Sequence, residues 1–181
     1  MKNKLKKITL LFTLLTYLSS YSQEKFNFDN KGLNDYLVLN FKDKTKSELY
    51  SKTINWIKET FKKPDEVINS KIENEKIFIE GISPSTLRIG GGSSMNAKYR
   101  IEIAFKEGKI KFNPTRLEYY TTEYGWNEIY INENAKRYYK KSGKVRGLYS
   151  ELITDIPSVF NNLSKGLENY IKGKKKTEED W

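Results

Sequence analysis

The stretch from Ala97 to Lys106 constrains the fold more than any other part of this 181-residue sequence, because apolar and polar side chains alternate along it. Its apolar positions are Tyr99, Ile101, Ile103 and Phe105, and the polar residues Lys98, Arg100 and Glu102 stand between them. Successive side chains of a β-strand point to opposite faces, so this pattern predicts a strand with one buried and one wet face. Such strands are typical of an antiparallel sheet that is covered on one side only.

The residues that follow predict the hairpin partner of this strand. Residues 107–108 (Glu-Gly) are a turn signal, and the apolar alternation continues beyond them to Phe112. At Leu117 the alternation resumes in the opposite phase. The phase changes around Pro114, which has no N–H to give to a ladder, so we expect a bulge or an edge position there.

Further stretches are rich in β-forming residues. Residues 36–41 predict a first strand, and residues 66–73 and 76–82 predict a hairpin joined by the polar pair 74–75. Residues 126–131 fit either another strand or a loop. Together with the central hairpin, these stretches supply enough strands for one sheet.

Two amphipathic helices are predicted, one early in the chain and one near its C-terminus. Residues 45–48 (Thr-Lys-Ser-Glu) form a capping-box motif in front of an apolar stripe that ends before Pro64. The first stripe comprises Tyr50, Ile54, Ile57 and Phe61, and the second comprises Ile156, Phe160, Leu163, Leu167 and Tyr170. The predicted fold is therefore one α+β domain of the order β-α-β-β-β-β-α, an antiparallel sheet with helices packed on one face.

The beginning of the chain has the layout of a secretory signal peptide. Lysines at positions 2, 4, 6 and 7 precede an apolar run from Ile8 to Leu18, and serines at positions 20 and 22 precede Gln23. We therefore predict a cleaved signal peptide (residues 1–22), a linker (23–34), the α+β domain (35–172) and a charged tail (173–181). The predicted location is exported, periplasmic or secreted, with no transmembrane span after cleavage.

Charge and composition restrict the chemistry of the exported part. The predicted signal peptide carries four of the 33 Lys and Arg and none of the 23 Asp and Glu, which leaves a net charge of +6. Because this charge is moderate and an exported protein does not meet the chromosome, we predict an envelope protein, a glycan or an anionic surface as partner and no nucleic acid. The chain has neither Cys nor His, so no zinc and no other cofactor is predicted.

A set of packing and turn residues accompanies this order of segments: Trp56-Ile57 before Pro64, Ile77 to Gly81, Tyr99 to Ile103 with Gly108-Lys109, Leu117 to Tyr120, and Tyr138 to Lys141. In these residues the chain resembles a family of exported Gram-negative domains of unknown function that are assigned a TBP-like fold. The resemblance extends over about residues 35–171. It implies a TBP-like fold and no functional residue, because one fold hosts many unrelated functions.

The most distinctive stretch for function is basic and aromatic, and it contains no acidic residue between Ala135 and Ser150. Our candidate binding surface comprises Tyr138, Tyr139, Lys140, Lys141, Lys144, Arg146 and Trp126. Aromatic rings stack on sugar faces while Lys and Arg neutralise anions, which favours a glycan or an anionic polymer. A solvated basic loop whose tyrosines pack on the sheet explains the same pattern.

The sequence contains no recognisable catalytic motif. The run Gly90–Ser94 lacks the ending of a phosphate-binding P-loop, and we interpret it as a flexible connection. We therefore predict a non-catalytic exported binding module. Two alternatives stay open: a carrier of a small apolar ligand in a cavity between helix and sheet, and a hydrolase that uses neither Cys, His nor zinc.

Overall fold

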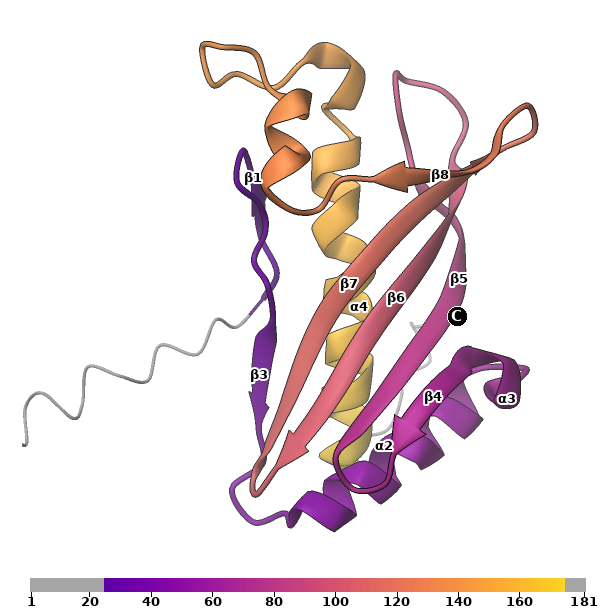
Figure 1. Ribbon diagram of the computed structural model, residues 1–181, viewed down its shortest axis with the longest axis vertical. Helices are drawn as coiled ribbons and strands as arrows, with labels where there is room; N and C mark the ends of the chain where they lie inside the picture. Colours follow the sequence, from indigo (N-terminus) through magenta and orange to yellow (C-terminus); the bar gives the residue numbers. More distant parts are fainter. Residues whose placement is uncertain (1–24, 175–181) are drawn as a thin grey trace, which may run out of the picture.

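A six-stranded antiparallel sheet is the framework of the domain (Figure 1). Its strands are β3 (Leu37–Asn40), β4 (Ile68–Ile72), β5 (Lys76–Leu87), β6 (Met95–Lys106), β7 (Lys109–Thr121) and β8 (Gly125–Ile129). They lie in the order β3-β7-β6-β5-β4, and β8 pairs with β7 as well. The structure, a computed structural model, describes residues 25–174, so the predicted signal peptide and the tail beyond Lys174 lie outside the described residues.

Two long helices cover one face of this sheet, as Figure 1 shows. They are α2 (Lys46–Thr60) and α4 (Leu152–Ile171); the shorter helices are α3 (Pro64–Val67) and the 3₁₀ helices η1 (Glu133–Tyr138) and η2 (Gly147–Tyr149). The predicted α+β class, an antiparallel sheet with helices on one face, is confirmed. Within residues 25–174, every helix is too short or too polar to span a bilayer.

The central strand β6 has the two faces that its sequence predicts. Ile101 and Ile103 are completely buried, whereas the polar residues Lys98, Arg100 and Glu102, which alternate with the apolar ones, remain partly exposed. The buried face packs under the helices, so the apolar stripe of α4, with Ile156 among its buried residues, closes the core from the other side. The opposite face of the sheet is open and charged.

A bulge interrupts the pairing of β6 with β7 where the apolar phase changes. Ile101 lies opposite Pro114 and Arg100 lies opposite Arg116, so Thr115 is the extra residue. The Thr115 hydroxyl donates to the Arg100 carbonyl at 3.1 Å. The predicted bulge around Pro114 is confirmed, one residue further along the chain.

Helix α2 begins with the predicted capping box. The Thr45 hydroxyl accepts from the Glu48 N–H at 3.2 Å, and the Glu48 carboxylate accepts from the Thr45 N–H at 2.8 Å. These reciprocal bonds satisfy backbone donors that the first helical turn leaves free. The pKa of Glu48 is lowered by its hydrogen bonds to Thr45.

Strand β5 is longer than predicted. The sequence predicts a strand that ends at residue 82, but Leu87 still pairs with Met95 and is completely buried. The register shifts between Ser83 and Leu87, where Ser85 has a φ of 52°. An irregular but buried strand end has no clean alternation, which is why a local pattern misses it.

The first described residues are not the linker that the sequence predicts. From residue 25 onward they pack on the domain as the small hairpin β1 (Phe28–Asp29) and β2 (Gly32–Leu33). Phe26 is 1% exposed, and its ring lies 6.0 Å from Phe112 and 5.9 Å from Phe160. The prediction is wrong for this segment because a few apolar residues spaced irregularly among polar ones still fill the core.

Candidate functional site

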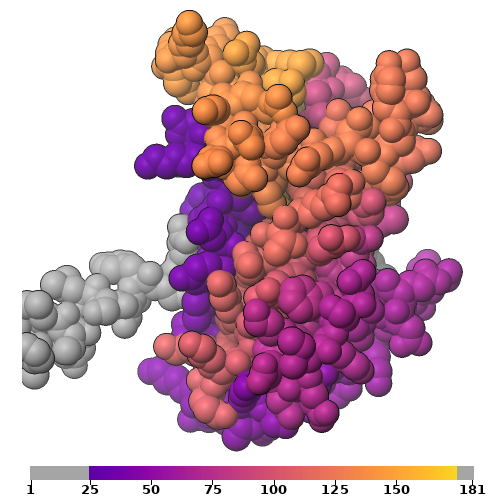
Figure 2. All heavy atoms as spheres, viewed as in Figure 1, coloured from indigo at the N-terminus to yellow at the C-terminus, as the bar shows by residue number. Residues whose placement is uncertain are grey.

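Residues Tyr139–Arg146 form a short hairpin, which we call the basic hairpin. Tyr139 and Val145 form a bridge, the Lys140 N–H donates to the Lys144 carbonyl at 2.7 Å, and the Gly143 N–H donates to the Lys140 carbonyl at 2.9 Å. Gly143 has a φ of 78°, a value that glycine adopts without strain. Figure 2 shows this segment protruding at the upper left of the molecule.

The basic hairpin presents cations that have no anionic partner among residues 25–174. Lys140, Lys141, Lys144 and Arg146 are all exposed. None of the ion pairs between described residues involves any of the four. Arg146 has a structural contact as well, since its Nε donates to the Tyr139 carbonyl at 3.1 Å. The three lysines are therefore the groups that are free to meet an external anion.

Tyr138 anchors the basic hairpin and is not part of its surface. Its side chain is only 5% exposed, and its ring lies edge-on to Tyr149 at 4.9 Å and near Phe28 at 6.1 Å. Its hydroxyl accepts from the Tyr130 N–H at 2.9 Å. Burial raises the pKa of Tyr138 to about 12, so the hydroxyl stays protonated at neutral pH. The prediction of Tyr138 as a surface residue is wrong.

Tyr139 has an intermediate position. Its side chain is half-buried and packs against the core, and burial raises its pKa as well. The tyrosines of the candidate surface thus fix the hairpin to the domain, while its lysines face solvent. Nothing in the local sequence separates these two roles, because both residue types alternate irregularly in the same segment.

Trp126 belongs to a different surface. It lies in β8 opposite Tyr120 of β7, with the two rings edge to face at 5.3 Å. The Lys98 ammonium lies 4.7 Å from the centre of the Trp126 ring and also pairs with the Glu118 carboxylate at 2.9 Å. Among the described residues, no ring contact, ion pair or hydrogen bond joins Trp126 to the basic hairpin. The structure therefore does not bring the whole predicted surface together.

The open face of the sheet neutralises its own charges. Besides the pair of Lys98 and Glu118, Arg100 contacts Glu80 at 2.6 Å and Lys76 contacts Glu102 at 3.1 Å. Each of these pairs joins neighbouring strands, which stabilises the sheet modestly. A polyanion gains little at these three cations, because each already has an acid beside it.

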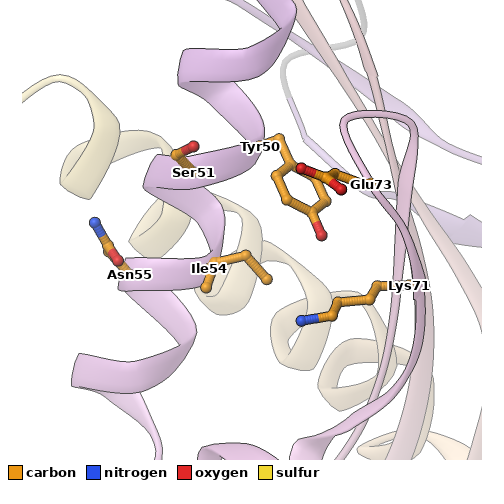
Figure 3. A pocket seen from close by; sticks show the side chains of 6 residues that line it. All are labelled: Tyr50, Ser51, Ile54, Asn55, Lys71 and Glu73. Carbon is orange, nitrogen blue, oxygen red and sulfur yellow. The ribbon is translucent and has the colours of Figure 1, made fainter.

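A cleft of about 500 Å³ lies between α2 and the β4–β5 hairpin. Figure 3 shows Tyr50 and Ile54 of α2 directed toward Lys71 and Glu73, which reach back from the hairpin. Burial, together with the charge of Glu73, raises the pKa of Tyr50, so this phenol is protonated at neutral pH. No hydrogen bond joins these four described side chains, so they do not form a coupled proton-transfer group. Sequence analysis missed this cleft because its two walls are far apart in the chain.

The fold and the site together define a single-domain α+β protein of TBP-like fold that carries an exposed basic hairpin at one end. Residues 36–120 match the domain of unknown function (DUF4468) with TBP-like fold. That match includes the sheet from β3 to most of β7 and ends before the basic hairpin. A search of curated proteins gave no match.

Two solved structures share this fold. A DUF4468 family protein from Bacteroides ovatus has a TM-score of 0.62 and 13% sequence identity, and the alignment covers 82% of this chain and 91% of that one. A TBP-like protein from Parabacteroides distasonis has a TM-score of 0.53, also at 13% identity, with 78% of this chain and 96% of that one covered. Likeness at this level of identity shows the fold alone.

Proposed function

We propose that this protein is an exported, non-catalytic binding module whose basic hairpin holds an anionic polysaccharide of the cell envelope. The observation that carries the proposal is the contrast between two surfaces. Lys140, Lys141 and Lys144 have no acidic partner among the described residues. On the open sheet face, by contrast, Lys76, Lys98 and Arg100 are each paired with an acid. An external polyanion therefore gains most at the basic hairpin.

The anchoring of the hairpin supports the same proposal. The Arg146 N–H donates to the Tyr138 carbonyl at 2.9 Å, and the buried Tyr138 ring holds the base of the hairpin against Tyr149. A loop that is already ordered loses less conformational entropy when it binds. The three lysines thus present a fixed pattern of positive charge, which suits a polymer with regularly spaced anions.

Binding to an anionic polysaccharide column tests the proposal. The triple variant Lys140→Ala, Lys141→Ala and Lys144→Ala is compared with the unmodified protein on immobilised polygalacturonate under a salt gradient. Loss of three exposed charge contacts weakens binding by roughly tenfold or more, so the variant elutes at lower salt. Elution of both proteins at the same salt concentration would contradict the proposal.

A matched variant controls for net charge. Lys42→Ala, Lys106→Ala and Lys109→Ala remove three exposed lysines from the opposite end of the sheet, near the β6–β7 turn. This variant keeps the elution position of the unmodified protein if the hairpin is the binding surface. Equal losses from both triple variants would instead indicate a delocalised charge effect. Binding to anionic lipid vesicles but not to the polysaccharide would contradict the proposed partner.

Export is the second part of the proposal, and it rests on the signal peptide predicted over residues 1–22. Intact-mass analysis of the protein recovered from the native cells tests it, with a mature chain that begins at Gln23 as the expected result. A mass that retains Met1 in a cytosolic extract would contradict export.

The filled core argues against the carrier of a small apolar ligand. Phe26, Phe112 and Phe160 are completely or almost completely buried, and the Phe26 ring contacts the other two rings between α4 and the sheet. A cavity for an apolar ligand requires space at this position. The cleft beside α2 does not favour the hydrolase alternative either, because no hydrogen bond joins its described side chains.

A further inference from the structure

Two strands, β3 and β8, pair with the same edge of β7. They do not meet, so a gap remains between them along this edge. β3 pairs with this edge up to Phe112, and β8 begins opposite Leu117, so no described strand faces residues 113–116 there. The bulge at Thr115 falls within the same four residues, and Pro114 lacks an N–H. The sheet edge is therefore interrupted where its strand is most irregular.

A cleft of about 360 Å³ occupies this gap, and we call it the sheet-edge cleft. Its walls are residues 113–115 and Lys111 of β7, the segment 33–36 that leads into β3, and residues 131–132 that follow β8. The volume lies at the lower end of the range for small-ligand pockets, which run from roughly 300 to 1,000 Å³. Three segments that are distant in sequence thus converge on a space of the size of one small ligand.

The cleft combines hydrogen-bonding groups with some apolar surface. Asn34, Asn113 and Asn132 bring carboxamides from three different segments, beside the apolar Leu33, Pro114 and Ile131. The Asn34 and Asn132 oxygens already accept from backbone N–H groups, but the Asn113 carboxamide makes no hydrogen bond within residues 25–174, so it offers both the donor and the acceptor that a hydroxyl group requires. Asp35 and Lys111 bring one negative and one positive charge, so their charges cancel. The lining therefore favours a neutral, hydroxyl-rich ligand over an anion or a cation.

Tyr36 adds an aromatic surface to this polar lining. Its side chain is 44% exposed, and the Lys111 ammonium lies 4.2 Å from the centre of its ring. This contact holds both side chains at the cleft. The C–H-rich face of a sugar ring packs on an aromatic ring while the hydroxyls of the sugar reach polar neighbours. The cleft supplies the aromatic ring with Tyr36 and the polar neighbours with its other side chains.

The wall of the cleft also contains an unmet hydrogen bond. The Asn34 Oδ1 accepts from the Asn27 N–H at 2.6 Å, which fixes the orientation of the carboxamide. The Asn34 Nδ2 is buried and, within residues 25–174, has no partner. Unsatisfied buried donors are rare in folded proteins, so this one needs an acceptor at the wall of the cleft, such as an ordered water or a group of a bound molecule.

We infer that the sheet-edge cleft binds one neutral sugar ring. An apolar ligand would leave the carboxamides and the charges of Asp35 and Lys111 without partners, and an anion meets the carboxylate of Asp35. An added peptide strand does not fit because the free edge extends over only four residues, one of which is Pro114. This inference does not rest on the proposed function of the basic hairpin, which uses other residues.

Saturation-transfer difference NMR on the purified protein tests the inference. The probes are glucose, galactose, mannose and N-acetylglucosamine, each measured alone, together with neutral oligosaccharides of the same sugars. At least one probe gives transfer to its ring protons, and Asn113→Ala weakens its affinity by about tenfold, the effect of losing one good hydrogen bond. Tyr36→Ala weakens it as well, because the ring face is lost.

Two control variants keep the result interpretable. Asn162→Ala removes an exposed asparagine of α4 outside the cleft, and the triple lysine variant of the basic hairpin removes the proposed anion contacts. Both retain sugar binding if the cleft is the site. Absence of transfer to every probe overturns the inference, and so does transfer that Asn113→Ala and Tyr36→Ala leave unchanged. Binding of an oligosaccharide alone, lost in Asn113→Ala, supports a site that reads a sugar unit within a longer glycan.

Discussion

The side chain of Asn161 holds both backbone polar groups of Phe26. The Phe26 N–H donates to Asn161 Oδ1 at 2.7 Å, and Asn161 Nδ2 donates to the Phe26 carbonyl at 3.0 Å. The two residues are 135 positions apart, so this contact ties the first described segment to the last helix. It also places the Phe26 ring in the core, where it contacts Phe112 and Phe160.

Asn161→Ala tests the contribution of this contact to stability. The substitution leaves two backbone groups without their partners, so the free energy of unfolding falls by about 1–3 kcal/mol. Urea unfolding followed by circular dichroism measures the change. The neighbouring variant Asn162→Ala serves as the control, because Asn162 is exposed and Ala favours helix. Equal stability of the two variants would mean that the contact between Asn161 and Phe26 contributes nothing to the free energy of unfolding.

Gly81→Ala tests the space that β5 leaves for a buried ring. Gly81 lies opposite Tyr99 across the β5–β6 ladder, and a Cβ at this position would collide with the Tyr99 hydroxyl oxygen and come within 2.7 Å of its Cζ. Because Tyr99 is 2% exposed and has little room to move, we expect a loss of about 1–3 kcal/mol.

Two further variants separate this clash from the general effect of losing a glycine. Gly92→Ala meets only an ordinary contact at 3.5 Å and should leave stability unchanged. In a Tyr99→Leu background the added cost of Gly81→Ala should shrink, since the obstructing atoms are gone. An undiminished cost would show that the backbone, and not the ring, rejects the side chain.

The elements that the sequence predicts well are those whose pattern is complete within a short window. The capping box at Thr45, the alternation of β6 and the bulge beside Pro114 each depend on residues that are close in sequence, and the structure contains all three. Their physics is local: a side chain bonds its own helix end, or a strand exposes one face. The α+β class follows from these elements because their apolar faces must meet.

The parts that the sequence does not predict depend on distant partners. Nothing near Phe26 indicates that Asn161 will bind it, and nothing near Tyr138 indicates that its hydroxyl will accept from Tyr130. The sequence predicts a binding surface in the basic and aromatic segment, but which of its residues face solvent is decided by tertiary packing. The sheet-edge cleft is beyond sequence reasoning, because it exists only where β3 and β8 fail to meet.

Arg88→Ala tests the ion pair that fixes the loop after β5 to α4. Arg88 Nε donates to Asp155 Oδ2 at 3.0 Å, Nη2 donates to Oδ1 at 2.6 Å, and the Arg88 backbone N–H also donates to Oδ2 at 3.0 Å. Hydrogen bonding to Asp155 raises the pKa of Arg88. Because Asp155 is only 7% exposed, removing the guanidinium leaves a nearly buried carboxylate with one remaining donor.

The expected result is a clear drop in melting temperature for Arg88→Ala. Arg88→Lys should recover only part of the loss, since an ammonium does not form the bidentate contact. The control is Lys63→Ala, which removes an exposed ion pair with Glu66. The side chains of Lys63 and Glu66 are 72% and 69% exposed. That variant should stay within experimental error of the unmodified protein. Similar melting temperatures for Arg88→Ala and Lys63→Ala would contradict a structural role for the Asp155 contact.

Tyr138→Phe separates the anchoring of the basic hairpin from its binding. The substitution keeps the ring but leaves the Tyr130 N–H without its acceptor, so the free energy of unfolding at neutral pH falls by about 1 kcal/mol. The elution salt concentration on polygalacturonate should remain the same, because the lysines are untouched. A lower elution salt concentration for a fully folded Tyr138→Phe variant would indicate that this hydroxyl takes part in binding.

The same variant predicts a change in the pH dependence of stability. Burial raises the pKa of Tyr138 from 10.0 to about 12 in the folded protein, so the folded state holds this proton after the unfolded chain has lost it. The contribution is therefore fully present below pH 10 and is lost as the pH rises from 10 to about 12. Urea unfolding across this range should show a steeper fall for the unmodified protein than for Tyr138→Phe. Parallel curves would mean that the hydroxyl is as accessible in the folded protein as in the unfolded chain. That outcome would contradict the burial of the Tyr138 ring against Tyr149 and Phe28.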